Sequence, residues 1–195
     1  MIRDITLLLV PKEKILIQQL KGKMISDMQI DLADTKEIKN NCYYNMCLSA
    51  KITCLEEEFA FYSEAVKTFD DEEFPRLHFN YFKDDSNDFK PLYTGSTRKE
   101  DYVEEIEVIH DHIEWMEHSG PWNLKIDVGI LLTFKSNNYL FISLLDSSVG
   151  LMETYYGNDI SWIFDREAIL DIYMIEPESV SHLKRDRVKL TRETG

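Results

Sequence analysis

The sequence lacks the short motifs that mark common catalytic and ligand-binding sites. Its seven glycines are scattered, and none forms the glycine-rich loop that cradles phosphate groups. It contains no G-x-S-x-G elbow to carry a nucleophilic serine. It also has no apolar run approaching the roughly 20 residues with which a helix crosses a membrane. These absences argue against a phosphate-loop NTPase, an α/β-hydrolase and a helical membrane protein.

Cysteine is scarce, with only Cys42, Cys47 and Cys54 in the chain. An odd number of cysteines, together with the absence of a signal-peptide core, predicts reduced thiols in a cytoplasmic protein. Their spacing does not match a zinc site, because no second closely spaced pair follows. We therefore expect buried structural cysteines, and we expect neither a metal nor another cofactor.

Positive charge is also in short supply. The chain has 22 Lys and Arg residues against 36 Asp and Glu residues, which gives a formal net charge of −14. Between Glu56 and Glu117 there are 19 acidic and 6 basic residues, whereas the rest of the chain is nearly balanced. This distribution argues against direct binding to nucleic acid or to an anionic membrane, since both need clustered Lys and Arg. It favours a basic protein partner.

The last segment reverses this charge. Residues 182–195 hold five basic and two acidic side chains. Two interpretations stay open: a flexible, solvated tail, or a segment that folds back on the acidic region. No Gly-, Ser- or Pro-rich linker divides the rest of the chain, so residues 1–181 are predicted to form a single domain.

Apolar periodicity predicts amphipathic helices. Within residues 55–69, and again within residues 102–116, apolar residues recur at i, i+4, i+7, i+11 and i+14, the spacing of one helix face. Capping boxes that begin at Thr53 and Thr97 precede these two stretches. Residues 34–50 also favour a helix, although Tyr43 and Tyr44 would suit a strand. Pro11 opens a short helix over residues 11–21.

Alternation of apolar and polar residues predicts strands. The clearest case is a hairpin over residues 126–145, with a turn at residues 136–138. Further strands are expected at residues 5–10, 27–32, 76–82, 151–156 and 161–164, and a short helix at residues 165–170. The predicted fold class is α+β, with an antiparallel sheet packed against two or three amphipathic helices.

The helix expected after Thr97 would carry an acidic ridge opposite its apolar face. Neighbouring like charges on a helix cost about 0.2–0.5 kcal/mol per pair, so such a ridge would weaken the free helix. We interpret it as a docking surface for a basic partner, and the alternative is the solvated surface of an acidic protein. The predicted partner-binding residues are Glu100, Glu104, Glu107, Asp111 and Glu114 of this ridge, and the acidic run Asp70, Asp71, Glu72 and Glu73.

Two histidine patterns suggest a different chemistry. On a strand, His110 and His112 would share a face and could chelate a metal, but on the expected helix they point about 200° apart. Glu107 and His110 have the Glu-x-x-His spacing of helical di-metal sites, yet the chain has no second copy. A metal-dependent hydrolase using Glu107 and His110 remains the enzymatic alternative.

Size, acidity and the lack of a catalytic motif together favour a non-enzymatic binding protein. This profile is similar to that of immunity proteins of bacterial polymorphic toxins, in composition and charge layout. The resemblance implies a cytoplasmic protein that inhibits a basic toxin, foremost a nuclease, with carboxylates occupying the positions of substrate phosphates. A non-catalytic scaffold or regulatory subunit is the remaining alternative.

Overall fold

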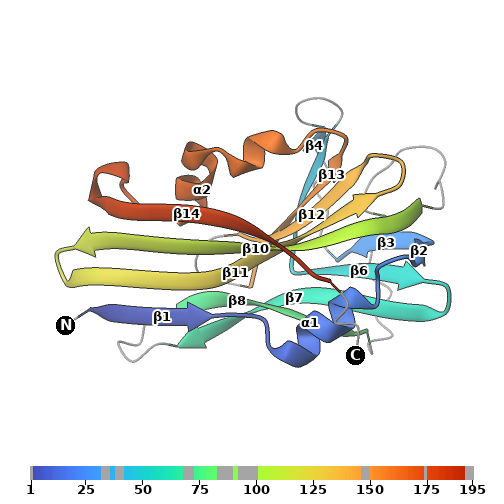
Figure 1. The fold of residues 1–195 in the computed structure, drawn as a ribbon, viewed down its shortest axis with the longest axis horizontal. Helices are drawn as coiled ribbons and strands as arrows, with labels where there is room; N and C mark the ends of the chain where they lie inside the picture. The colour runs from blue at the N-terminus through green and yellow to red at the C-terminus, as the bar shows by residue number, and fades with distance from the viewer. Residues whose placement is uncertain are drawn as a thin grey trace.

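The computed structural model describes residues 2–31, 36–37, 42–67, 73–82, 90–91, 101–145, 150–173 and 175–191. Strands account for 64% of the structure and helices for 14%. The architecture is a curled antiparallel sheet, so the predicted α+β class with helices packed on a sheet is wrong (Figure 1).

Within the described residues, the larger sheet has the strand order β14-β10-β11-β12-β13-β5-β4. Along this path the strands are β14 (Val180–Lys189), β10 (Asp101–Glu117), β11 (Gly120–Phe134), β12 (Tyr139–Leu144), β13 (Met152–Gly157), β5 (Tyr43–Cys47) and β4 (Lys36–Glu37). Off the path, β1 (Arg3–Leu7) pairs in parallel with β11, and β2 (Met24–Ile25) pairs with the start of β10.

The smaller sheet has the order β8-β7-β6-β3-β9. Its strands are β8 (Glu73–Tyr81), β7 (Glu57–Lys67), β6 (Ser49–Cys54), β3 (Asp27–Ile30) and β9 (Lys90–Pro91). The helical segments are α1 (Pro11–Gln18), η2 (Ser161–Phe164), α2 (Arg166–Tyr173) and η3 (Pro177–Ser179). In Figure 1, α1 lies at the lower edge of the molecule and α2 lies on the opposite side, above β14.

The segment predicted as the helix after Thr97 is strand β10. In a strand, residues i and i+4 share one face and residue i+7 lies on the other, so the apolar stripe is divided between two faces. In the middle of β10 both faces are covered, and the run Ile106, Glu107, Val108 and Ile109 is buried without interruption. Burial on both faces hides the two-residue period by which a strand is normally recognised.

The other two long helix predictions are also wrong. The described part of residues 55–69 forms strand β7 over Glu57–Lys67, with Phe59, Ala60 and Phe61 buried in succession. Within residues 34–50, the described part forms β4, β5 and the start of β6. Residues 161–164, predicted as a strand, form the 3-10 helix η2.

Several shorter predictions are confirmed. The hairpin over residues 126–145 is β11–β12, and Asn137 in its turn has the left-handed φ of 62°. Helix α1 begins at Pro11, as expected. Strands β1, β3, β8 and β13 and helix α2 overlap their predicted ranges.

Apolar side chains form one continuous buried cluster that reaches both sheets. Cys42, Cys47 and Cys54 belong to it as free thiols, which confirms the expectation of buried structural cysteines. Burial raises the pKa of Cys42 and of Cys54 to about 11, and it raises the pKa of Cys47 still more. These thiols are therefore poor nucleophiles at neutral pH.

The basic segment that begins at His182 folds back on the acidic region as far as Lys189. Strand β14 pairs antiparallel with β10 over Glu107–Trp115, at the edge of the larger sheet. The basic side chains of β14 thereby come to lie beside the acidic side chains of β10.

Candidate functional site

Strand geometry divides the predicted acidic ridge between the two faces of β10. Glu107 and Asp111 lie on one face, where their side chains are almost completely buried. Glu114 lies on the other face and is partly exposed, and Glu104 is exposed at a bulge in the strand. The ridge therefore does not form a single surface.

The two buried carboxylates are neutralised by β14. Arg185 donates from Nε to Asp111 Oδ1 at 2.7 Å and from Nη2 to Asp111 Oδ2 at 2.6 Å. The Tyr173 hydroxyl donates to the same carboxylate at 2.7 Å, and burial raises the pKa of Tyr173 well above its ordinary value. Arg187 Nε donates to Glu107 at 3.2 Å. Glu107 and Asp111 are thus interior ion-pair partners, unavailable to a docking protein.

The remaining predicted acidic residues have different outcomes. Glu100, Asp70, Asp71 and Glu72 lie outside the described residues. Glu73 begins strand β8 and is exposed, with Lys67 Nζ 3.7 Å from its carboxylate. Glu73 also lines a cavity between the two sheets' described strands β8, β10, β11 and β12.

This cavity has a volume of about 500 Å³. It lies between the start of β8, the turn end of the β10–β11 hairpin and the segment after α2. Its apolar lining includes Phe74, Trp115, Leu124, Ile126, Leu144 and Ile175. A concave apolar surface of this size is the usual form of a binding site.

Three carboxylate residues, Glu73, Glu117 and Glu176, share this lining. All three are exposed, and the described lining contains no Lys or Arg. Glu117 accepts a hydrogen bond from Trp115 Nε1 at 2.8 Å, which fixes it beside the apolar wall. We call this feature the acid-rimmed cavity. It combines an apolar interior with a negative rim, and so it suits a ligand that is apolar and cationic.

Aromatic rings support one wall of the acid-rimmed cavity. Trp115 and Trp122 stack across the β10–β11 pair with ring centroids 5.5 Å apart, and Phe74 lies 6.0 Å from Trp122. The neighbouring Met116 side chain is 57% exposed. Large aromatic and methionine side chains are enriched at protein interfaces.

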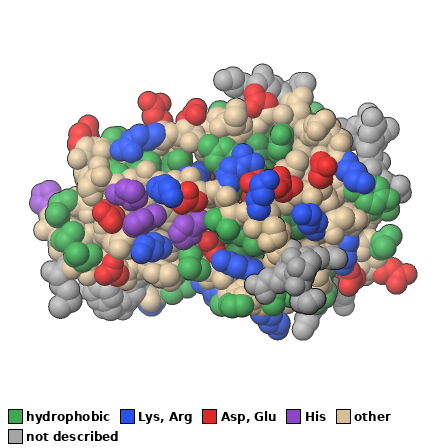
Figure 2. Space-filling model, in the orientation of Figure 1, with side chains coloured by type: hydrophobic (Ala, Val, Ile, Leu, Met, Phe, Trp, Pro, Cys, Tyr) green, Lys and Arg blue, Asp and Glu red, His purple; other side chains and the backbone are tan. Residues whose placement is uncertain are grey.

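Histidines gather on another surface, over β10 and β14. Because this segment is a strand, His110 and His112 do share a face, and the helix-based argument that separated them is wrong. The rings of His112 and His182 lie 4.7 Å apart. Figure 2 shows purple histidine side chains mixed with both blue and red ones, so the viewed face is not uniformly acidic.

The arrangement of possible metal ligands differs from the hydrolase prediction. Glu107 and His110 are three residues apart on a strand, so their side chains lie on opposite faces of β10. His110 Nδ1 lies 3.0 Å from Asp127 Oδ1, and His112 Nε2 lies 2.9 Å from Asn123 Oδ1. Over the described ranges, no group of three or more His, Cys, Asp and Glu side chains is placed to hold a metal ion.

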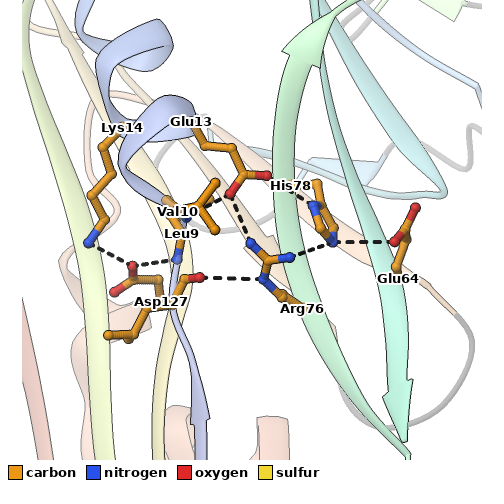
Figure 3. Close-up of polar contacts among 9 residues, drawn as sticks. Leu9, Val10, Glu13, Lys14, Glu64, Arg76, His78 and Asp127 are labelled. Carbon is orange, nitrogen blue, oxygen red and sulfur yellow. Dashed lines mark hydrogen bonds and ion pairs between the residues drawn. The ribbon is translucent and has the colours of Figure 1, made fainter.

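A polar network that was not predicted from the sequence holds α1 (Figure 3). The buried carboxylate of Glu13 accepts from Arg76 Nη2 at 3.0 Å and from the Val10 amide at 2.8 Å. His78 Nδ1 lies 2.9 Å from the same carboxylate. Glu13 stands three residues after Val10 at the start of α1. This is the spacing at which a glutamate bonds back to the first amide of a helix, and it was the signal available in the sequence.

A second carboxylate fixes the opposite side of α1. Asp127 of β11 accepts from the Leu9 amide at 2.9 Å and lies 3.1 Å from Lys14 Nζ. Together with Glu13, it ties α1 to β8 and β11. The network is fully satisfied, and we interpret it as structural.

No protein-family model matches the chain, and neither does any curated protein or solved structure. In the part of the chain that the structure describes, no helix is long and apolar enough to cross a membrane. The function is therefore inferred from the chain's own residues.

Proposed function

We propose that the protein binds a basic protein and inhibits it, as an immunity protein neutralises a nuclease-type toxin. The observation that carries this proposal is the acid-rimmed cavity, where Glu73, Glu117 and Glu176 surround an apolar interior. In this proposal the protein binds its partner and catalyses no reaction. It acts in the cytoplasm, where its three buried thiols stay reduced.

Two physical effects support this role. The net charge of −14 attracts a cationic protein over long distances and raises the rate of encounter. The cavity then provides local anchoring, because a partner's apolar side chain can fill it while adjacent Lys or Arg side chains meet the rim. Inhibition follows if those basic residues are the ones with which the partner binds its own anionic substrate.

The test compares two triple variants with the same change in net charge. Glu73→Lys, Glu117→Lys and Glu176→Lys reverse the rim of the acid-rimmed cavity. Glu56→Lys, Glu64→Lys and Glu167→Lys are the control, since these exposed carboxylates are neither in its lining nor among the predicted partner-binding residues. Both variants should keep the wild-type circular dichroism spectrum and unfold cooperatively.

Each protein is immobilised and exposed to a lysate of its source cells at low salt, and retained proteins are identified by mass spectrometry. We expect one basic protein on the wild type and the control, and affinity lowered about tenfold or more by the rim variant. The purified partner should lose its activity when the wild type is added. Equal weakening by both variants would show that net charge alone attracts it, and retention of no basic protein would overturn the proposal. A retained partner with undiminished activity would favour the scaffold alternative.

A further inference from the structure

A second, smaller cavity of about 210 Å³ lies between β12–β13 and the segment formed by η2 and α2. Three aromatic side chains, Phe141, Tyr155 and Trp162, contribute to its lining. Tyr155 and Trp162 meet edge to face with centroids 5.2 Å apart, and Phe141 stacks on Tyr155 at 6.1 Å. None of its described lining residues belongs to the acid-rimmed cavity except Leu145.

A buried carboxylate completes this lining. Glu153 is 9% exposed and accepts hydrogen bonds from the hydroxyls of Tyr44, at 2.8 Å, and Tyr155, at 2.5 Å. Both donors are neutral, because burial raises the pKa of each tyrosine above its ordinary value. They satisfy the oxygens of Glu153 but do not neutralise its charge.

Glu153 differs in this respect from the other buried carboxylates. Asp111 faces Arg185, Glu107 faces Arg187, Glu13 faces Arg76 and Asp127 faces Lys14. Among the described residues, no Lys, Arg or His pairs with Glu153. A buried carboxylate without a cation is costly. Each of the other four carboxylates buried in the described structure has a cationic partner, whereas the charge of Glu153 has none there.

We propose that this cavity binds the quaternary ammonium group of a small organic cation, with Glu153 as counter-ion and Phe141, Tyr155 and Trp162 as an aromatic cage. Aromatic faces attract cations, most strongly in desolvated sites, and cages of this kind recognise quaternary ammonium groups. A volume of 210 Å³ holds about seven water-sized groups, which is the size of choline. We call this feature the ammonium cage.

Two details of the wall fit this assignment. The Phe141 ring lies directly over Gly129, since a Cβ atom at Gly129 would be 2.7 Å from Phe141 Cε2. Glycine therefore allows the ring its position in the cage. Trp162 Nε1 is buried and has no hydrogen-bond partner among the described residues, and a hydroxyl or carbonyl oxygen on the ligand would satisfy it.

Calorimetric titration with choline chloride tests the proposal, with sodium chloride at matched ionic strength as the baseline. The second probe is the neutral isostere of choline, in which carbon replaces the ammonium nitrogen. We expect saturable binding of choline, and binding at least about tenfold weaker for the isostere, because only choline carries the charge. Equal binding of both probes would show an apolar cavity only, and the absence of saturable choline binding would overturn the assignment.

Variants locate the binding. Glu153→Gln removes the charge and keeps an acceptor for the two tyrosines, while Trp162→Leu removes one wall; each should weaken choline binding about tenfold or more. Glu56→Gln, at an exposed carboxylate that lines neither cavity, is the matched control and should bind choline like the wild type. If Glu153→Gln does not fold, the choline affinity of Trp162→Leu decides whether the cage binds choline. Unchanged affinity in a folded cage variant would overturn the proposal, whether or not a basic protein partner is found.

Discussion

Arg185 and Asp111 form a doubly hydrogen-bonded ion pair in the interior, between the edge strand β14 and its neighbour β10. The two side chains are 3% and 0% exposed. Arg185 Nη1 also donates to the Ile163 carbonyl at 3.0 Å, so the same guanidinium holds η2 in place. One arginine thus connects the edge strand, the strand beside it and the segment that covers the ammonium cage.

Breaking this pair should be strongly destabilising. Arg185→Met leaves Asp111 buried without a cation, and we expect a loss of about 3–5 kcal/mol in the free energy of unfolding. Adding Asp111→Asn should recover much of that loss, because the uncompensated charge is removed. Urea unfolding measures both. Lys184→Met is the control on the same strand, and since Lys184 is 60% exposed we expect a change within about 0.5 kcal/mol. A similar loss in Lys184→Met would contradict the assignment.

Gly129→Ala should damage both the sheet and the ammonium cage. The added Cβ would lie 2.6 Å from the Ile142 carbonyl oxygen and 2.7 Å from Phe141 Cε2. We expect a loss of about 1–3 kcal/mol in urea unfolding, together with weaker choline binding as Phe141 is displaced. Gly22→Ala is the comparison. A Cβ there meets no atom within 4 Å, but the φ of +79° is unfavourable for alanine. It should lower stability by about 1 kcal/mol and leave choline affinity unchanged.

Glu153 should make stability depend on pH with an unusual sign. Burial raises the pKa of Glu153 above its ordinary 4.5, against the opposing effect of the two tyrosine hydrogen bonds. The folded protein therefore holds this proton to a higher pH than the unfolded chain does. The stabilisation is complete below the unfolded pKa and is lost as pH rises through the folded pKa.

The contribution of Glu153 is isolated by comparing wild type with Glu153→Gln, which does not titrate. Their difference in unfolding free energy should shift in favour of Glu153→Gln as pH rises above about 4.5. Choline should oppose this shift, since its charge favours the ionised carboxylate. If the difference in unfolding free energy between wild type and Glu153→Gln is constant with pH, the Glu153 carboxylate has the same pKa in the folded and unfolded states, which contradicts this prediction.

A turn between β6 and β7 holds a residue ill suited to its backbone. Leu55 has a φ of 57° and is 73% exposed. A non-glycine residue in this left-handed region costs about 1–2 kcal/mol. Replacement by glycine recovers only part of this cost, because glycine also makes the unfolded chain more flexible. Leu55→Gly should therefore raise the unfolding free energy by about 0.5–1 kcal/mol. Asn137→Gly, at a φ of 62°, should change it less, because asparagine tolerates this conformation. A destabilised Leu55→Gly would contradict this explanation.

The sequence predicted elements whose signals are local. The β11–β12 hairpin has alternating residues on either side of an asparagine turn, and α1 has Pro11 at its start. For β10, a richness in β-branched residues such as Ile106, Val108 and Ile109 was the available strand signal. The apolar spacing of i, i+4 and i+7 outweighed it, because burial on both faces over Ile106–Ile109 removed the expected alternation there.

The sites depend on long-range pairing that no local pattern contains. Glu107 and Asp111 looked like exposed charges because their partners, Arg187 and Arg185, lie 80 and 74 residues further along the chain. The acid-rimmed cavity is likewise assembled from β8, the β10–β11 hairpin and the segment after α2. Among the described residues of the predicted surface, Glu73 lines the acid-rimmed cavity.

The pairing of β10 with β14 also constrains the order of events during translation. At about 5–20 residues per second, a separation of 74 residues delays Arg185 by about 4–15 s after Asp111 has been made. During that interval no arginine neutralises Asp111 and Glu107, so the two carboxylates are more stable in water than buried in the interior. Strand β10 can complete its native packing only after β14 has been synthesised, so this protein is expected to fold late and as a unit.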